Sequence, residues 1–176
     1  DEWENKIEQL AKVTAEENVT SLAGVPTWTL LLLKKILAIK GKATINEVWP
    51  NLELYINGGV SLIPYREQFD KIFGGKINYL EIYNASEGCF ASQQCPDDDG
   101  MLLFTEHGIF YEFMPVDQYG KKDPVTVGLK NVVTGKNYAL VISTTGGLWR
   151  YLVGDTVQFT SINPYKIKLT GRLKHY

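Results

Sequence analysis

The residues best suited to chemistry follow an apolar run in "EIYNASEGCF", residues 81–90. Tyr83 ends the run, and Ser86 and Glu87 follow it after Asn84 and Ala85. A tyrosine ring can stack on a planar base, which contributes about 1–3 kcal/mol per base. A serine hydroxyl can donate to a phosphate oxygen, and Mg²⁺ binds carboxylates together with phosphate oxygens. The stretch therefore favours a nucleotide phosphate with its metal, and the alternative is a loop in which Ser86 caps a following helix.

Two further stretches place small or charged residues at the ends of predicted strands. In "YINGGVSLIPY" the pair Gly58 and Gly59 has no Cβ atoms and lets the backbone approach a ligand, or it makes a tight strand-to-helix turn. In "GLWRYLVGDTV" a strand is expected to end at Asp155, whose carboxylate can accept both hydroxyls of a ribose. The alternative is an aspartate in a hairpin turn. Arg172, after the last predicted strand, can bind ribose or phosphate, or it is a surface arginine.

The sequence leaves open two questions about possible catalytic groups. Glu112 in "FYEFMP" alternates with apolar neighbours and lies either on the solvent face of a strand or in a pocket. A serine hydrolase would need a G-x-S-x-G elbow, but the first glycine is missing before Ser86. His107 lies in a predicted turn and His175 at the end of the sequence, so a serine hydrolase is the weaker hypothesis.

Composition excludes several classes of function. The chain has 176 residues, a net charge of −2 and no basic stripe, which argues against nucleic acid as a partner. Cys89 and Cys95 are interpreted as free thiols of a cytoplasmic protein, without the ligand spacing of a zinc site. The longest apolar stretch contains Lys34 and Lys35 and is too short to cross a bilayer, so no membrane is expected. Because no Met begins the chain and its last residues follow a strand-like run, we expect a piece of a longer protein.

The spacing of apolar residues predicts an α/β fold followed by a β-rich part. Residues 1–96 alternate helices and strands, which is typical of a parallel sheet. Pro26 is expected to begin one helix and Gly41 to end it. Residues 97–172 contain short β-rich runs separated by turn residues, which indicates an antiparallel, barrel-like subdomain. The stretch "STTGG", residues 143–147, is predicted to be a hairpin turn between two strands.

Taken together, these motifs resemble the adenylate-forming enzymes. Within them, the stretches "GVPTW", "WPNLELYINGGVSLIPYREQF", "YNASEG", "FYEFMP" and "GLWRYLVGDTV" resemble the auxin-responsive acyl-acid amido synthetases of the Gretchen Hagen family, and most closely their bacterial members. The resemblance covers nearly the whole chain but only about a third of a full family enzyme. It implies a ligase that uses ATP and Mg²⁺ to adenylate a carboxylic acid and then transfers the acyl group to the amine of an amino acid.

The resemblance also assigns roles to individual residues. It places Tyr83 against the adenine, Ser86 at the α-phosphate and Glu87 at Mg²⁺. It gives Asp155 the ribose hydroxyls and puts Arg172 near the ribose. The remaining implied positions are the nucleotide-binding glycines Gly58 and Gly59, Val60 at the border with the acyl substrate, and Lys174 at the hinge residue.

Two parts of the family pattern are missing from this sequence. The Ser/Thr/Gly-rich phosphate loop lies upstream in the family, and nothing before residue 24 resembles it. The carboxy-terminal domain is also absent, and residues 173–176 are expected to begin the hinge that leads to it. We therefore expect the chain alone to be inactive, with its partners being the missing parts of the same protein and small-molecule substrates. The alternatives are an acyl-coenzyme A ligase and a non-catalytic nucleotide-binding module.

Overall fold

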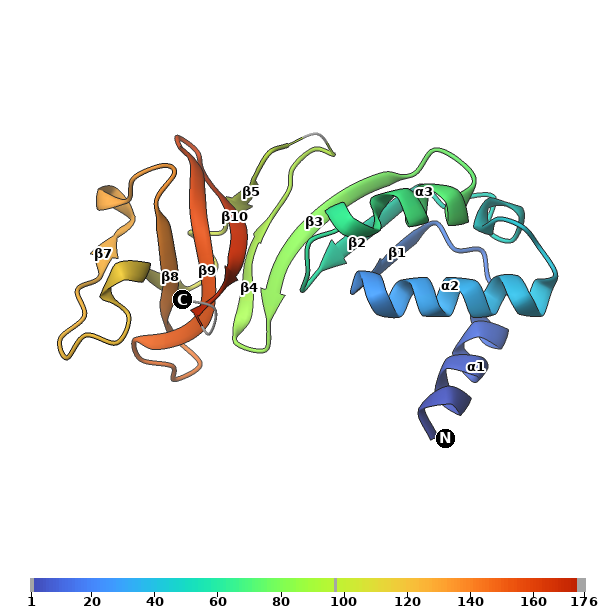
Figure 1. The fold of residues 1–176 in the computed structure, drawn as a ribbon, viewed down its shortest axis with the longest axis horizontal. Coiled ribbons are helices and arrows are strands. Elements are labelled where there is room, and N and C mark those ends of the chain that lie inside the picture. Colours follow the sequence, from blue (N-terminus) through green and yellow to red (C-terminus); the bar gives the residue numbers. More distant parts are fainter. Residues whose placement is uncertain (1, 97, 174–176) are drawn as a thin grey trace. The chain divides into compact units, whose positions relative to one another are not determined.

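The computed structural model describes residues 2–96 and 98–173 of the chain, which forms two units, residues 1–81 and 82–176. The boundary lies before the composition shift near residue 96, because β3 (Asn78–Ala85) and β4 (Gly88–Ser92) form a hairpin and β4 then pairs with β5 (Met101–Leu103). The first unit contains the α-helices and the parallel strands, and the second unit contains the β-rich sequence (Figure 1). The predicted change from α/β to β structure is confirmed.

The first unit is a small α/β layer. Its strands follow the order β1-β2-β3, and β1 and β2 are parallel, as predicted, with Gly24 opposite Asn57. Tyr55 of β2 packs against Phe69 and Phe73 of α3, with ring centroids 4.7 and 6.1 Å apart. Its elements are α1 (Glu2–Thr14), β1 (Ser21–Gly24), α2 (Pro26–Lys40), β2 (Leu54–Gly58), α3 (Arg66–Phe73) and the beginning of β3 (Asn78–Ala85).

The second unit is an antiparallel sheet with strand order β3-β4-β5-β10-β9-β8-β6-β7. Among the described residues this series does not close on itself, so the sheet is open where the sequence suggested a barrel. Its aromatic core includes Phe113, whose ring lies 4.9 Å from that of Phe159. Its further strands are β4 (Gly88–Ser92), β5 (Met101–Leu103), β6 (Ile109–Pro115), β7 (Val127–Gly128), β8 (Asn137–Thr144), β9 (Tyr151–Ile162) and β10 (Tyr165–Arg172).

Local signals in the sequence explain the helix ends. Pro26 begins α2 and Gly41 ends it in the left-handed conformation, as predicted, with its N–H donating to the carbonyl of Leu37. The longest helix of the described residues, α2, has 15 residues, and none of these helices has the length and hydropathy of a membrane span.

Two helix-ending glycines provide a matched pair for a stability test. Gly41 has φ +61°, and no atom lies within 4 Å of the position that a Cβ would occupy, whereas a Cβ on Gly74 (φ +70°) would overlap the side chain of Thr44. We expect Gly41→Ala to destabilise the first unit by about 1 kcal/mol, the cost of a left-handed alanine. Gly74→Ala should cost about 3 kcal/mol, because the overlap is added to that cost. Urea unfolding followed by the fluorescence of buried Trp49 measures both, and equal losses would contradict the role of Thr44.

Candidate functional site

Three of the residues predicted from sequence meet in the second unit. The Tyr83 hydroxyl donates to Oδ2 of Asp155 over 3.0 Å, and Nε of Arg172 lies 2.7 Å from Oδ1 of the same carboxylate. Asp155 is only 7% exposed, whereas the Arg172 side chain is 68% exposed. The carboxylate therefore has one buried partner and one partner that extends into solvent.

The backbone brings Asp155 and Arg172 together because they stand opposite each other in the antiparallel pair of β9 and β10. The predicted strand end at Asp155 is wrong, since β9 continues to Ile162. Gly154, directly before Asp155, has φ +91°, which glycine adopts without a Cβ penalty. The glycine thus marks a bulge inside a strand rather than a turn, and Arg172 is the last residue of its strand.

Tyr83 contributes its hydroxyl to this arrangement. The side chain is 3% exposed, and its ring packs against Phe90 with centroids 4.8 Å apart in the core of the second unit. The open ring face that the sequence suggested for a purine is therefore covered by core packing. Burial, and then the negative charge and hydrogen bond of Asp155, raise the pKa of Tyr83 far above its usual value. The side chain consequently stays protonated and remains a donor to Asp155.

Ser86 and Glu87 form the turn between β3 and β4. Because a strand follows this turn, the alternative in which Ser86 caps a helix is wrong. Ser86 is exposed and Glu87 is partly exposed. The charge of Glu87 also helps to raise the pKa of Tyr83, after the larger effects of burial and Asp155, so the turn is electrostatically coupled to the buried hydroxyl.

A metal ion at this turn would depend on Glu87 and on groups of a substrate. Among residues 2–96 and 98–173, no three His, Cys, Asp or Glu side chains are grouped to hold a metal. One carboxylate combined with phosphate oxygens and water is nevertheless how Mg²⁺ is usually bound. The partly exposed carboxylate of Glu87 fits that mode of binding.

The predicted glycine pair lies in the first unit. Gly58 is the last residue of β2, and Gly59 and the exposed Val60 follow it. Sequence reasoning missed Asn57, which is buried directly before the pair and whose Nδ2 has no hydrogen-bond partner. The available signal was an amide two residues after the core residue Tyr55, on the same buried face of the strand. Lys174 lies outside the described residues.

The serine hydrolase hypothesis gains no support from the geometry. His107 lies in the turn before β6, as predicted, and its ring packs against Phe104 with centroids 4.5 Å apart. Within the described part of the chain, Ser86 forms no hydrogen bond with a histidine. His175 is outside the described residues. Cys89 and Cys95 are free thiols, as predicted.

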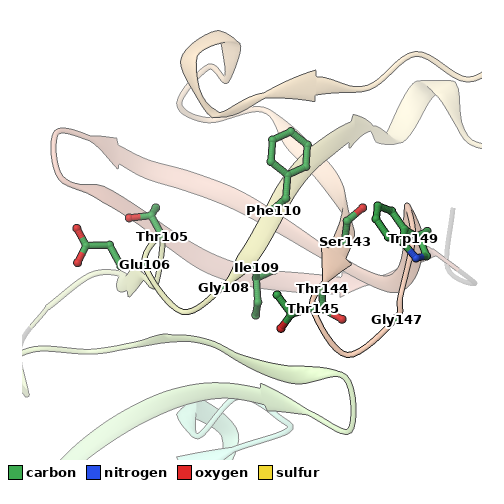
Figure 2. A pocket seen from close by; sticks show the side chains of 10 residues that line it. All are labelled: Thr105, Glu106, Gly108, Ile109, Phe110, Ser143, Thr144, Thr145, Gly147 and Trp149. Atoms are coloured by element: carbon green, nitrogen blue, oxygen red, sulfur yellow. The ribbon is translucent and has the colours of Figure 1, made fainter.

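A cavity of about 530 Å³ lies elsewhere in the second unit, between the β5–β6 and β8–β9 turns. Figure 2 shows that Ile109 and Phe110 point to opposite sides of β6, and that Trp149 comes from the β8–β9 connection. The stretch "STTGG" forms the predicted hairpin turn at one side of this cavity. Two of its hydroxyls already bind the backbone, since Ser143 accepts from the N–H of Arg150 and Thr144 from that of Leu148. These two groups therefore serve the turn itself.

Comparison with known proteins agrees with both halves of the sequence. The GH3 family N-terminal domain matches residues 1–77, and the GH3 family central domain matches residues 102–172. The indole-3-acetic acid-amido synthetase GH3.3 of Arabidopsis thaliana is 31% identical over 123 residues, which cover 66% of this chain and 20% of that protein. The jasmonoyl-L-amino acid synthetase GH3.5 of Oryza sativa subsp. japonica is 30% identical, covering 65% of this chain and 22% of that protein. The chain thus spans about a fifth of the length of these relatives.

Solved structures show the same fold at lower identity. The acyl acid amido synthetase AtGH3.15 in complex with 2,4-DB has a TM-score of 0.75 and 18% identity, over 98% of this chain and 39% of that one. A 2-hydroxyisobutyryl-CoA ligase in complex with 2-HIB-AMP and CoA has a TM-score of 0.67 and 15% identity, over 95% of this chain and 35% of that one. The chain therefore shares the fold of part of each of these two enzymes. With its two halves matching the N-terminal and central domains, the chain belongs to the GH3 family.

Proposed function

We propose that this chain is part of an ATP-dependent acyl-acid amido synthetase. In the first step a carboxylate oxygen of the substrate acid attacks the α-phosphorus of ATP, and the bond to pyrophosphate breaks. In the second step the amine nitrogen of an amino acid attacks the acyl carbonyl, AMP leaves, and the amine loses a proton. The observation that supports this most is the meeting of Tyr83, Asp155 and Arg172 in a chain with both GH3 domain matches.

The second unit supplies the groups proposed to bind the nucleotide. Asp155 accepts hydrogen bonds from the two ribose hydroxyls, which replace or join the hydrogen bonds that it now accepts from Tyr83 and Arg172. Arg172 is exposed enough to reach the ribose or a phosphate while it stays paired with Asp155. Tyr83 holds Asp155 in place through its hydroxyl and borders the adenine site, although its ring face is covered in this structure.

The β3–β4 turn is proposed to bind the phosphates. Ser86 donates its hydroxyl to the α-phosphate, and Glu87 is the protein ligand of Mg²⁺. When bound, Mg²⁺ neutralises phosphate charge that would otherwise repel the attacking carboxylate. Catalysis in this proposal depends on positioning and charge stabilisation and needs no protein nucleophile.

The carboxyl end of β2 in the first unit carries further residues that we propose contact the substrates. Gly58 and Gly59 let a ligand approach the backbone at the carboxyl end of β2, and Val60 offers an apolar contact. Asn57 is added to these residues because its unpaired, buried Nδ2 is a donor that an oxygen of a ligand can satisfy. The partners are then a carboxylic acid, an amino acid and further parts of the same protein, in the cytoplasm.

An acyl-coenzyme A ligase is the second candidate, because the chain also has the fold of a CoA ligase. The two enzymes share the adenylation step and differ in the acceptor. A non-catalytic nucleotide-binding module is less well supported, since the acidic and basic groups of the proposed site are all present.

The proposal is tested by pyrophosphate exchange with the full-length protein and a panel of aryl and alkyl carboxylic acids. We expect exchange into ATP that depends on one class of acid and on Mg²⁺, with background exchange when the acid is omitted. Product analysis with amino acids or coenzyme A then separates an amide from a thioester. If none of the acids in the panel supports exchange, the result would favour a non-catalytic module. The isolated 176-residue chain should show no exchange, and turnover at the rate of the intact protein would contradict its assignment as a fragment.

A further inference from the structure

Glu112, whose role the sequence left open, forms a two-point ion pair with Arg150. Nε of Arg150 donates to Oε2 of Glu112 and Nη2 donates to Oε1, both over 3.0 Å. Thr126 completes the arrangement, because its hydroxyl donates to Oε1 of Glu112 over 2.6 Å and accepts from Nη2 of Arg150 over 3.1 Å. The Glu112 side chain is 16% exposed and that of Arg150 is 64% exposed. These contacts join β6, the segment before β7 and the β8–β9 connection.

The backbone of Arg150 shows that this pair holds a strained position. Arg150 has φ +44°, and among the described residues it is the only residue other than glycine with positive φ. A left-handed conformation costs free energy for a residue with a Cβ. It persists only where contacts with the surrounding structure hold the residue in place. Here the guanidinium contacts and the backbone N–H, which donates to Oγ of Ser143 over 2.9 Å, provide those contacts.

Arg150 directly precedes β9, the strand that carries Asp155. Tyr151, the first residue of β9, pairs with Ile142 of β8. Further along, Val153, Gly154 and Asp155 stand opposite the single β8 residue Leu140, because the pairs on either side join Leu152 to Val141 and Thr156 to Ala139. Asp155 therefore lies inside a bulge, and its position depends on how both ends of that bulge are held.

We propose that the Glu112–Arg150 pair is a positioning device that fixes the start of β9 and thereby places Asp155 against Arg172. The pair sets the amino-terminal end of the bulge, and the pairing of β9 with β10 sets the other end. Neither Glu112 nor Arg150 needs to touch a substrate in this role. The inference rests on the proposed function for its kinetic consequence, namely ribose binding by Asp155, but its structural part stands on the geometry alone.

The kinetic test uses Glu112→Gln, Arg150→Gln and the double variant of the full-length protein. We expect each single variant to raise KM for ATP about tenfold while KM for the acid changes less than twofold, because only the ribose ligand is displaced. The double variant should raise KM for ATP less than twofold further, since both changes break the same pair. Arg150→Lys keeps the positive charge but loses the two-point hydrogen bonding of the guanidinium. Its KM for ATP should therefore fall between those of wild type and Arg150→Gln. An unchanged KM in Glu112→Gln with a raised KM in Arg150→Gln would overturn the proposal, because Arg150 would then act without its partner.

Control variants come from an exposed pair of the first unit, Glu67 and Lys71, whose charged atoms lie 2.6 Å apart. Glu67→Gln and Lys71→Gln make the same kinds of change on the surface of α3 and should leave both KM values unchanged. An equal rise of KM for ATP in these controls would overturn the assignment to the Glu112–Arg150 pair.

Amide hydrogen exchange separates this proposal from the proposed function. In Glu112→Gln, the amides of residues 151–155 should exchange at least tenfold faster than in wild type, while those of β10 away from the bulge stay protected. This readout needs no turnover, so it tests the pair even if the full-length protein catalyses no exchange. Unchanged protection of residues 151–155 would overturn the positioning role whatever the enzyme does.

Discussion

Replacing Asp155 with alanine in the full-length protein is expected to lower kcat/KM for ATP in pyrophosphate exchange about 1,000-fold. Each hydrogen bond to a charged group contributes about 1.5–3 kcal/mol, and a ribose would form two of them with this carboxylate. Their combined loss, about 4 kcal/mol, corresponds to that factor. The two groups paired with Asp155, Tyr83 and Arg172, are both donors, so neither can replace its acceptor oxygens.

Two companion variants separate binding from structure at Asp155. Asp155→Asn keeps the shape and an acceptor for the Tyr83 hydroxyl but loses the charge opposite Arg172, so we expect a smaller loss of about 100-fold. Tyr83→Phe removes only the hydroxyl and should cost less than about tenfold if Tyr83 acts through Asp155. Circular dichroism checks that each variant is folded, because alanine leaves the buried hydroxyl without its acceptor. A folded Asp155→Ala protein with unchanged kcat/KM would remove the basis of the proposed nucleotide site.

The second large effect is expected for Glu87→Gln. The neutral amide is a weaker Mg²⁺ ligand than a carboxylate, so adenylation should slow about 100-fold at limiting Mg²⁺. Part of the activity should return as the Mg²⁺ concentration rises, because the substrate phosphates still supply ligands. Pyrophosphate exchange measured across a Mg²⁺ titration gives both the loss and the recovery.

Glu106 supplies the matched control for Glu87. It is also a carboxylate in a turn of the second unit, but it lies in the β5–β6 turn beside the cavity. Glu106→Gln should therefore leave the Mg²⁺ titration unchanged. If Glu87→Gln and Glu106→Gln behave alike, the β3–β4 turn does not bind the metal and the role given to Glu87 is wrong.

Much of the local structure followed from short-range signals. The limits of α2 could be predicted because Pro26 suits a first turn and Gly41 suits a left-handed end. The strand β8 matches its apolar run, residues 137–144, from end to end. In contrast, β4 was missed because the Ser86–Glu87 turn lacks the Asn-Gly or Asp-Gly signature of a hairpin. Signals of this kind act within a few residues, so they can be seen in the sequence itself.

The residue types of the candidate site could also be predicted, but not all of their surroundings. Tyr83, Asp155 and Arg172 were singled out separately, and the structure brings all three together. Their sequence separation of up to 89 positions is closed by strand pairing in the second unit. The covered ring of Tyr83 was not predicted, because burial depends on which distant side chains pack against it.

The sequence by itself determined the family, the order of the α-helices and of most strands, and the side chains available for nucleotide chemistry. Only the tertiary structure decided that Asp155 lies in a strand bulge, that the β-rich sheet is open among the described residues, and that Glu112 pairs with Arg150. The physical reason is that alternation and turn residues define a strand's faces and ends, whereas its partner and register depend on interactions between residues far apart in the chain.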